Sequence, residues 1–381
     1  TQEPFWPHYP GRSVQVLNGT WSFGLLPIDA FDPLTVPYST LTNLTPNTTQ
    51  VPMSWDAALP GSSELDATNI ALFRTSVGCT TGKVSLMKFY AVNNYARVFV
   101  DGKQVADHRN GPYTPFEFAA PACGSSGEYD VLVVTRNGYN STLSPTWTGG
   151  DFHCFSGIVR EVVVLELPSA MFWVDRVDTF TASVDAGTVN VTVHLNGSSI
   201  PSTVHLSLSF NGASGTMKEY GVVDGVVQVG VLSVPDFKPW RLGEGNLFTL
   251  RVDVHETGDA VEVRSGVREI GVEGGRLTLN GEVVKLHGVN RHAMTTDRGA
   301  AVTAEQQRQD AAILVESNVN AVRAGHYPQS QRWLDLMDEH GIVFWEEALG
   351  PGTSLKDYTN PYFMEHQLAA VRAMVTTSIN H

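Results

Sequence analysis

A histidine, an arginine with a second histidine three residues later, and a glutamate each follow one of three short apolar runs near the end of the chain. Side chains at the carboxyl ends of neighbouring parallel strands can meet at one edge of a sheet and line a pocket there. Guanidinium groups fork around carboxylates, so an arginine and a glutamate in this arrangement could also form a supporting pair. Each residue has a purely structural alternative, in which it caps backbone carbonyls. The four residues are His292, Arg323, His326 and Glu347.

Short apolar strands and helices alternate in the segment that carries these residues. A capping box at Thr303 predicts a helix through Glu316, and Gly341 predicts the end of another helix that starts near Ser330. Asn360, followed by a proline, predicts the start of a third helix. The predicted strands are residues 283–289, 319–322 and 342–345. This βαβαβα order favours a parallel sheet, either doubly wound or a barrel.

The helix predicted after Asn360 has one apolar stripe, formed by Met364, Leu368, Val371 and Val375. A parallel sheet of three strands would leave unpaired edges, and this stripe would have nothing to cover it. We therefore expect part of the fold to lie outside this chain.

The first two thirds of the chain read as β-structure. From Trp21 to about Leu167, short apolar runs separated by turns predict a β-sandwich, with a hairpin at Asp101-Gly102. From Phe172 to about Val272, strict alternation of apolar and polar residues predicts strands with one buried face and one wet face. The length of this second block, about 100 residues, fits an immunoglobulin-like sandwich.

Composition limits the classes of function. The chain has 381 residues, which predicts two or three domains, and a net charge of −14, which disfavours binding to nucleic acids and to anionic membrane surfaces. It contains no apolar stretch long enough to span a membrane. Motifs for dinucleotides, for nucleotide phosphates and for common zinc sites are absent from the sequence, so we expect no cofactor and no metal.

Sequons and cysteines indicate the compartment. Six Asn-x-Ser/Thr sequons, about twice what chance would give, favour a secreted or lysosomal or vacuolar glycoprotein. Cys79 and Cys123 each adjoin a strand in a turn region, and we expect them to form a disulfide, which leaves Cys154 as a free thiol. The sequons are at Asn18, Asn43, Asn47, Asn140, Asn190 and Asn196.

Several segments in the same order along the chain resemble glycoside hydrolase family 2, the group of β-glucuronidases, β-galactosidases and β-mannosidases. They are residues 18–23 (NGTWSF), 100–102 (VDG), 111–116 (GPYTPF), 151–160 (DFHCFSGIVR), 286–292 (LHGVNRH), 320–328 (NAVRAGHYP) and 336–347 (LMDEHGIVFWEE). The resemblance implies a multidomain fold: a sugar-binding jelly-roll β-sandwich at 1–168, an immunoglobulin-like β-sandwich at 169–272, and the first three βα units of a (β/α)8 TIM barrel at 273–381.

The resemblance also implies a retaining exo-β-glycosidase that hydrolyses terminal β-linked sugars, with its catalytic acid/base and nucleophile beyond His381. His292, Arg323, His326 and Glu347 match pocket positions of the family. Asp151 matches the aspartate by which the jelly roll reaches the terminal sugar. We expect a β-glucuronidase-like member, with a β-galactosidase-like member as one alternative and a non-catalytic carbohydrate-binding or structural protein as another. Relatives are often oligomers, so we expect a homo-oligomer or association with the missing C-terminal part.

Overall fold

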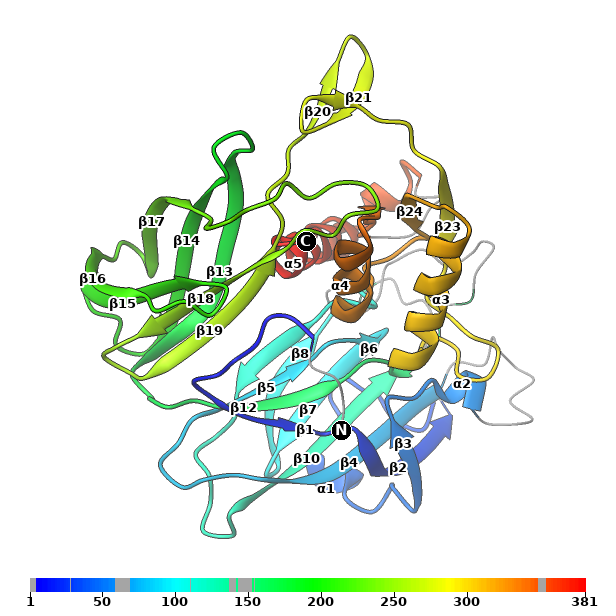
Figure 1. The fold of residues 1–381 in the computed structure, drawn as a ribbon. Helices are drawn as coiled ribbons and strands as arrows, with labels where there is room; N and C mark the ends of the chain where they lie inside the picture. Colours follow the sequence, from blue (N-terminus) through cyan, green and yellow to red (C-terminus); the bar gives the residue numbers. More distant parts are fainter. Residues whose placement is uncertain are drawn as a thin grey trace.

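The computed structural model describes residues 5–27, 29–58, 69–109, 111–136, 142, 153, 155–348 and 354–381. Two β-sandwiches are followed by a small projecting antiparallel sheet and then by a parallel sheet with helices packed beside it (Figure 1). Among the described helices, none has both the length and the apolar composition that crossing a membrane requires.

The first sandwich contains a sheet of four strands, in the order β1-β12-β5-β9, and a sheet of six, in the order β3-β2-β4-β10-β7-β8. Its core is rich in large side chains, among them the fully buried Trp21, Trp55 and Phe73. The predicted Asp101-Gly102 hairpin is confirmed between β7 and β8, where both residues have positive φ. The elements are β1 (Ser13–Val16), β2 (Gly19–Pro27), α1 (Tyr38–Leu41), β3 (Asn47–Val51), α2 (Trp55–Ala58), β4 (Asn69–Gly78), β5 (Ser85–Phe89), β6 (Val92–Asn93), β7 (Tyr95–Val100), β8 (Lys103–His108), β9 (Phe116–Ala119), β10 (Glu128–Arg136), β11 (Gly157–Ile158) and β12 (Val162–Glu166).

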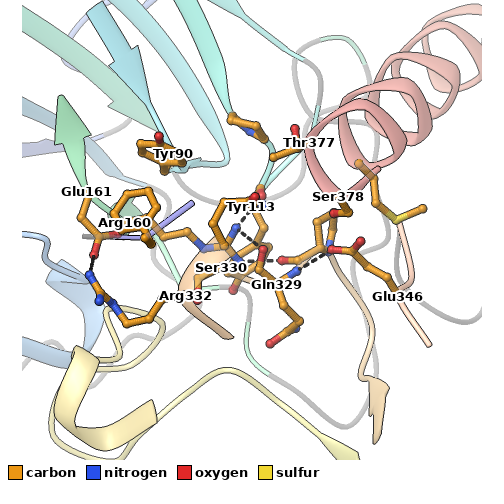
Figure 2. Close-up of a pocket in the computed structure, with 15 residues that line it drawn as sticks. Tyr90, Tyr113, Arg160, Glu161, Gln329, Ser330, Arg332, Glu346, Thr377 and Ser378 are labelled. Carbon is orange, nitrogen blue, oxygen red and sulfur yellow. Dashed lines mark hydrogen bonds and ion pairs between the residues drawn. The ribbon is translucent and has the colours of Figure 1, made fainter. Parts of the chain in front are cut away.

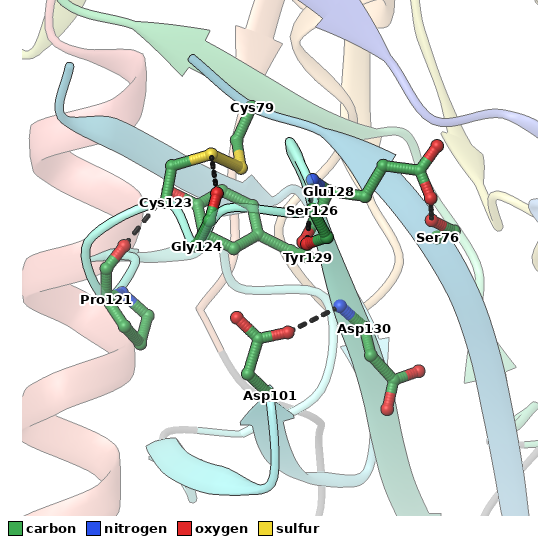
Figure 3. The surroundings of a disulfide bond; sticks show 10 residues. All are labelled: Ser76, Cys79, Asp101, Pro121, Cys123, Gly124, Ser126, Glu128, Tyr129 and Asp130. Atoms are coloured by element: carbon green, nitrogen blue, oxygen red, sulfur yellow. Dashed lines mark hydrogen bonds between the residues drawn. A yellow bond between two sulfur atoms is a disulfide. The ribbon is translucent and has the colours of Figure 1, made fainter. Parts of the chain in front are cut away.

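A disulfide joins Cys79, just after β4, to Cys123 in the loop before β10, with their Cα atoms 5.8 Å apart (Figure 3). The hydroxyl of Tyr129 donates to the carbonyl of Pro121 at 3.0 Å, close to this link. The pairing is the one that the sequence predicts. Cys154, the predicted free thiol, lies outside the described residues.

The second sandwich packs a sheet of three strands, β13-β14-β17, against one of four, β16-β15-β18-β19. Valines fill most of its core, and the predicted alternation holds along β14 and β18, where every second side chain is buried. The immunoglobulin-like assignment stays a prediction. The elements are β13 (Phe172–Ser183), β14 (Thr188–Gly197), β15 (Thr203–Phe210), β16 (Thr216–Gly221), β17 (Val226–Ser233), β18 (Phe248–Val254) and β19 (Asp259–Ser265).

The third part begins with a small antiparallel sheet and continues as a parallel sheet in the order β23-β24-β25. In the parallel sheet, Arg323 of β24 lies in register between Asn290 of β23 and Trp345 of β25. The elements are β20 (Ile270–Glu273), β21 (Arg276–Leu279), β22 (Glu282–Val283), β23 (Gly288–Arg291), α3 (Ala304–Glu316), β24 (Ala321–Ala324), α4 (Gln331–His340), β25 (Val343–Trp345), the 3₁₀ helix η1 (Asp357–Thr359) and α5 (Pro361–Ser378).

The three predicted helices are confirmed with their caps. The Thr303 side chain accepts from the backbone N–H of Gln306 in a capping box, Gly341 ends α4 in the left-handed conformation, and Asn360 caps α5. The strand predictions were wrong in detail. Residues 284–287 belong to no strand, because Val283 pairs with β21 whereas pairing with β24 begins at Gly288. The second strand begins at Ala321, two residues later than predicted.

Helix α5 turns its predicted apolar stripe outward. Phe363, His366 and Ala370 are the buried residues of this helix. Met364, Leu368, Val371 and Val375 are between 39% and 49% exposed. The stripe is therefore uncovered, as the sequence predicts for a sheet of three strands.

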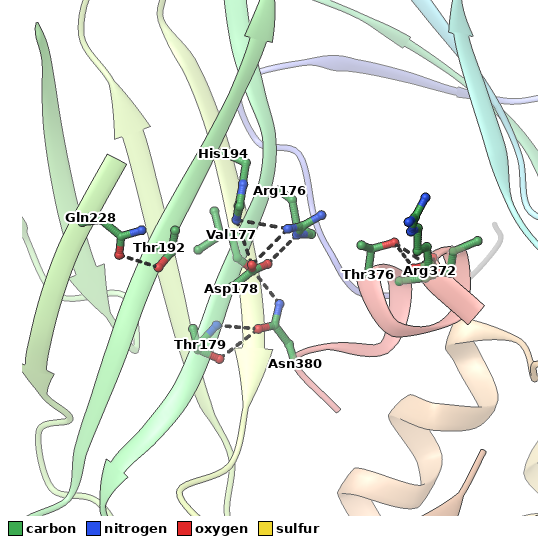
Figure 4. Close-up of polar contacts among 12 residues, drawn as sticks. Arg176, Val177, Asp178, Thr179, Thr192, His194, Gln228, Arg372, Thr376 and Asn380 are labelled. Carbon is green, nitrogen blue, oxygen red and sulfur yellow. Dashed lines mark hydrogen bonds and ion pairs between the residues drawn. The ribbon is translucent and has the colours of Figure 1, made fainter. Parts of the chain in front are cut away.

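Asn380 ties the end of α5 to the second sandwich. Its side-chain oxygen accepts from the backbone N–H and the hydroxyl of Thr179, both at 2.9 Å, and its amide nitrogen donates to the carbonyl of Val177 at 2.8 Å (Figure 4). Strand β13 is an edge strand, so Asn380 satisfies backbone groups that no neighbouring strand reaches. This contact fixes how α5 sits against the sandwich.

Candidate active site

Three adjacent parallel strands bring the four predicted pocket residues to one edge of the sheet. Arg323 lies within β24 and His326 two residues beyond it, while His292 directly follows β23 and Glu347 follows β25. The strands run parallel, so their carboxyl ends share this edge. The four side chains meet at this edge, and their role in binding a sugar stays a prediction.

Arg323 and Glu347 form a two-pronged ion pair. Arg323 Nε lies 2.5 Å from Glu347 Oε1, and Arg323 Nη2 lies 3.1 Å from Oε2. His326 Nδ1 is 3.1 Å from Glu347 Oε2 and 3.0 Å from Arg323 Nη2, so this nitrogen either donates to the carboxylate or accepts from the guanidinium according to its tautomer. The ring of His292 lies edge-on to that of His326, with centroids 5.3 Å apart.

The cluster is open on one side. The side chain of Arg323 is 40% exposed, against 19% for Glu347 and 10% for His326. Strand β25 has no partner on its other side among the described residues, and Trp345 on that strand is exposed. The four residues line neither the cavity of about 330 Å³ in the second sandwich nor the one of about 170 Å³ between the first sandwich and α3. They form one wall of a site that the described residues do not enclose.

Asp151, the predicted sugar-binding residue of the first sandwich, lies outside the described residues. Its neighbourhood is partly described. Phe155 packs with Ala300 and Tyr327 in one buried apolar cluster, and its carbonyl accepts from the side chain of Asn93. Phe155 therefore lies against the loops after β23 and β24.

Glu346 contacts different residues from Glu347. Its Oε1 accepts from the backbone N–H of Gln329 at 3.1 Å, and burial raises the pKa of its carboxyl group (Figure 2). Around it lies a buried set of residues that sequence reasoning missed, including Arg160, Tyr113 and Gln329. The contact from Arg160 to Pro328 spans 168 positions, and no local pattern carries a signal for it.

The predicted glycosylation sites occupy different surroundings. Asn43, Asn47 and Asn196 are exposed, and Asn190 is half-buried on the outer face of β14. Asn18 instead lines the cavity between the first sandwich and α3, with its side-chain oxygen buried. Asn140 lies outside the described residues.

Residues 14–168 match the family model "Glycosyl hydrolases family 2, sugar binding domain", and residues 270–381 match "Glycosyl hydrolases family 2, TIM barrel domain". The chain belongs to glycosyl hydrolase family 2. The part after the second sandwich is thus a portion of a family 2 TIM barrel, and β23, β24 and β25 are three of its strands.

Three similar proteins illustrate the range of the family. A β-glucuronidase of Bacteroides fragilis is 32% identical over 294 residues, which cover 71% of this chain and 42% of that protein. A β-galactosidase of Leuconostoc mesenteroides is 27% identical over 328 residues, 75% of this chain and 31% of that protein. A crystal structure of a family 2 β-galacturonidase from Eisenbergiella tayi bound to galacturonate has a TM-score of 0.84 at 22% identity, covering 98% of this chain and 64% of that one. The chain thus spans less than half the length of these two curated relatives.

Proposed function

We propose that this family 2 chain forms one wall of the active site of a retaining exo-β-glycosidase that removes terminal β-linked sugars. The observation that carries the proposal is the convergence of His292, His326 and the Arg323–Glu347 pair at the carboxyl ends of three adjacent barrel strands. Enzymes with this barrel place their active sites at that end of the strands. The exposed side of the cluster is where a terminal sugar would sit.

The chemistry assigned to these residues is binding and orientation of the sugar. Imidazole and guanidinium N–H groups and carboxylate oxygens offer donors and acceptors for hydroxyl groups arranged around a ring. Arg323 and His326 both contact Glu347, so the carboxylate is held in one orientation before a sugar arrives. Such preorganisation lowers the cost of placing the anomeric carbon for attack.

In the proposed mechanism, two further carboxyl groups perform the bond cleavage. A retaining glycosidase uses one carboxylic acid to protonate the leaving oxygen and a second carboxylate, about 5 to 5.5 Å away, to attack the anomeric carbon. We assign both groups to barrel strands other than β23, β24 and β25. The unpaired edge of β25 and the exposed stripe of α5 support this assignment, because the remainder of a barrel would cover both.

A uronic acid is our first candidate for the terminal sugar. The support is the similarity to the β-glucuronidase of Bacteroides fragilis, whose identity of 32% exceeds that of the β-galactosidase from Leuconostoc mesenteroides. A β-galactoside is the second candidate, and that galactosidase supports it.

The proposed compartment is secretory, either extracellular or lysosomal or vacuolar. The disulfide between Cys79 and Cys123 supports an oxidising environment, and the exposed sequons at Asn43, Asn47 and Asn196 support passage through it. We also retain homo-oligomerisation as a proposal, which light scattering on the full-length protein tests.

The experiment is a substrate panel with the full-length protein. We expect hydrolysis of the 4-nitrophenyl β-glycoside of glucuronic acid, galacturonic acid, galactose or mannose, with the β-anomer as the first product in the proton NMR spectrum. His326→Ala should abolish most of this activity, whereas His205→Ala, at an exposed site in the second sandwich, should not. No hydrolysis of any of the four substrates contradicts the enzyme and favours a carbohydrate-binding protein.

A further inference from the structure

Arg160 of the first sandwich is buried against the barrel loop that follows β24. It lies between β11 and β12 and is 8% exposed. Its Nη2 donates to the carbonyl of Pro328 at 2.5 Å, and its Nη1 donates to the carbonyls of Gln329 at 3.1 Å and Tyr113 at 2.9 Å (Figure 2). One guanidinium thus binds three peptide carbonyls, two of which belong to the barrel.

These three hydrogen bonds are costly to lose. Burial lowers the pKa of Arg160 to about 10, although the neighbouring Tyr113 and Glu346 partly oppose this, so the group remains charged at neutral pH. A buried carbonyl that loses its donor forfeits its solvation without compensation. Removing Arg160 would therefore leave the carbonyls of Pro328 and Gln329 without this donor, within three residues of His326.

Tyr113 supports the same loop through its ring. It stacks on Tyr327 with ring centroids 3.8 Å apart and an angle of 12° between the planes. The hydroxyl of Tyr327 in turn accepts from the backbone N–H of Ala293 at 3.1 Å. Tyr327 follows His326 and Ala293 follows His292, so this stack reaches the ends of two barrel strands.

The barrel holds the opposite side of the loop. The backbone N–H of Gln329 donates to Glu346 at 3.1 Å, and its side-chain oxygen accepts from Arg291 Nη1 at 3.1 Å. Residues 327–329 are therefore held between the sandwich, through Arg160 and Tyr113, and the barrel, through Arg291 and Glu346. Without the hydrogen bonds from Arg160 and the Tyr113 stack, the bonds from Arg291 and to Glu346 remain, as does the packing of Tyr327 with Phe155 and Ala300.

We infer that Arg160 and Tyr113 are positioning residues, through which the first sandwich fixes the loop at 325–329 and, with it, the imidazole of His326 at the sugar site. We call this pair the Arg160–Tyr113 clamp. That the clamp fixes the loop follows from the contacts alone. That it thereby supports catalysis rests on the proposed function. The clamp contacts the loop at Pro328, Gln329 and Tyr327, the three residues that follow His326.

The test is Arg160→Met in the full-length protein, with Arg97→Met as its matched control. Arg97 is 7% exposed in the same sandwich and also donates to backbone carbonyls, those of Pro33 at 3.1 Å and Val36 at 2.9 Å. Hydrogen exchange measured by mass spectrometry reports on residues 325–329, and steady-state kinetics separate kcat from KM.

For Arg160→Met, we expect exchange at 325–329 to rise about tenfold while strands β4 and β10 stay protected, and kcat to fall by roughly 10- to 100-fold with KM changed less than about threefold. Arg97→Met should raise exchange near residues 33–36 and leave kcat within about twofold of the parent. Tyr113→Leu, which keeps the carbonyl bound by Arg160 and removes the ring stack, should give a smaller effect at 325–329. This variant also serves if Arg160→Met does not fold.

Unchanged exchange at 325–329 in both clamp variants overturns the inference. An equal rise there in Arg97→Met also overturns it, because the effect would then be general loss of stability. The exchange experiment needs no substrate. If the parent protein hydrolyses none of the four glycosides, the proposed function is wrong. The exchange result still shows whether Arg160 and Tyr113 hold the loop in place.

Discussion

Arg323 binds both carboxylate oxygens of Glu347, with Nε 2.5 Å from Oε1 and Nη2 3.1 Å from Oε2. The two residues end up together because β24 and β25 are neighbours in a parallel sheet, which places both at its carboxyl edge. His326 contacts the same carboxylate, so a single glutamate after β25 organises two side chains from the end of β24. Replacing Glu347 should therefore affect the sugar site more than the fold.

Glu347→Gln tests this organising role. The variant loses the charge that pairs with Arg323, a side chain that is 40% exposed. Solvent screens such a pair, so the free energy of unfolding should change by no more than about 1 kcal/mol. Misplaced binding groups should lower kcat/KM by roughly 10- to 100-fold. Urea unfolding and kinetics of the full-length protein measure the two effects.

Glu305→Gln is the control for this variant. Glu305 pairs with Arg308 at 2.9 Å within α3, and its side chain is 62% exposed. It should leave both stability and kcat/KM close to those of the parent. Equal kinetic losses in the two variants would contradict a specific role for Glu347.

His108 should make stability depend on pH. Burial lowers the pKa of its imidazole to about 4, against an ordinary value of 6.5. Between these values the unfolded chain binds a proton that the folded protein does not, so the free energy of unfolding falls as the pH falls, by about 3 kcal/mol over the window. His366 of α5 lies close enough to His108 for their charges to interact. Burial lowers the pKa of His366 as well, so this residue also reduces the free energy of unfolding as the pH falls.

His108→Gln isolates this contribution. Burial raises the pKa of Asp335 to about 6, which stabilises the fold as the pH falls, but this group is present in both proteins and cancels in the comparison. Between pH 7 and pH 4.5 the variant should lose about 2 to 3 kcal/mol less than the parent in urea unfolding. Identical pH dependence in the two proteins would show that His108 is not buried as described.

The disulfide between Cys79 and Cys123 closes a loop with a sequence separation of 44 residues. Chain-entropy arguments give about 4 kcal/mol of stabilisation for a loop of this size. We expect Cys79→Ser to lower the free energy of unfolding by an amount of this order. Thiol titration of the denatured, unreduced chain should find one free sulfhydryl, that of Cys154, and finding three would rule out the disulfide.

Glycans should be confined to the two sandwiches, because no sequon follows residue 196. We expect modification at Asn43, Asn47, Asn190 and Asn196 when the protein is made in a eukaryotic secretory host. Asn18 should be unmodified in the folded protein, because its side chain lines a cavity of only about 170 Å³. Mass spectrometry after enzymatic deglycosylation checks each site, and a glycan on a peptide from 275–381 would contradict this distribution.

The sequence predicted features set by neighbouring residues better than contacts between segments far apart in the chain. The caps at Thr303, Ser330 and Gly341 are local hydrogen-bonding patterns, and they located α3 and α4 within a residue. The meeting of Arg323 with Glu347 followed from strand order and from family resemblance. The contact between Arg160 and the carbonyl of Pro328 could not be predicted, because it depends on how two domains dock.

The position of a bound sugar tests the account most directly. We would determine the crystal structure of the full-length protein in complex with the sugar that it releases. We predict a pyranose ring at the carboxyl ends of β23, β24 and β25, with a hydroxyl or carboxylate group within hydrogen-bond distance of His326, Arg323 or Glu347. A sugar bound elsewhere, with these side chains still facing solvent, would contradict it.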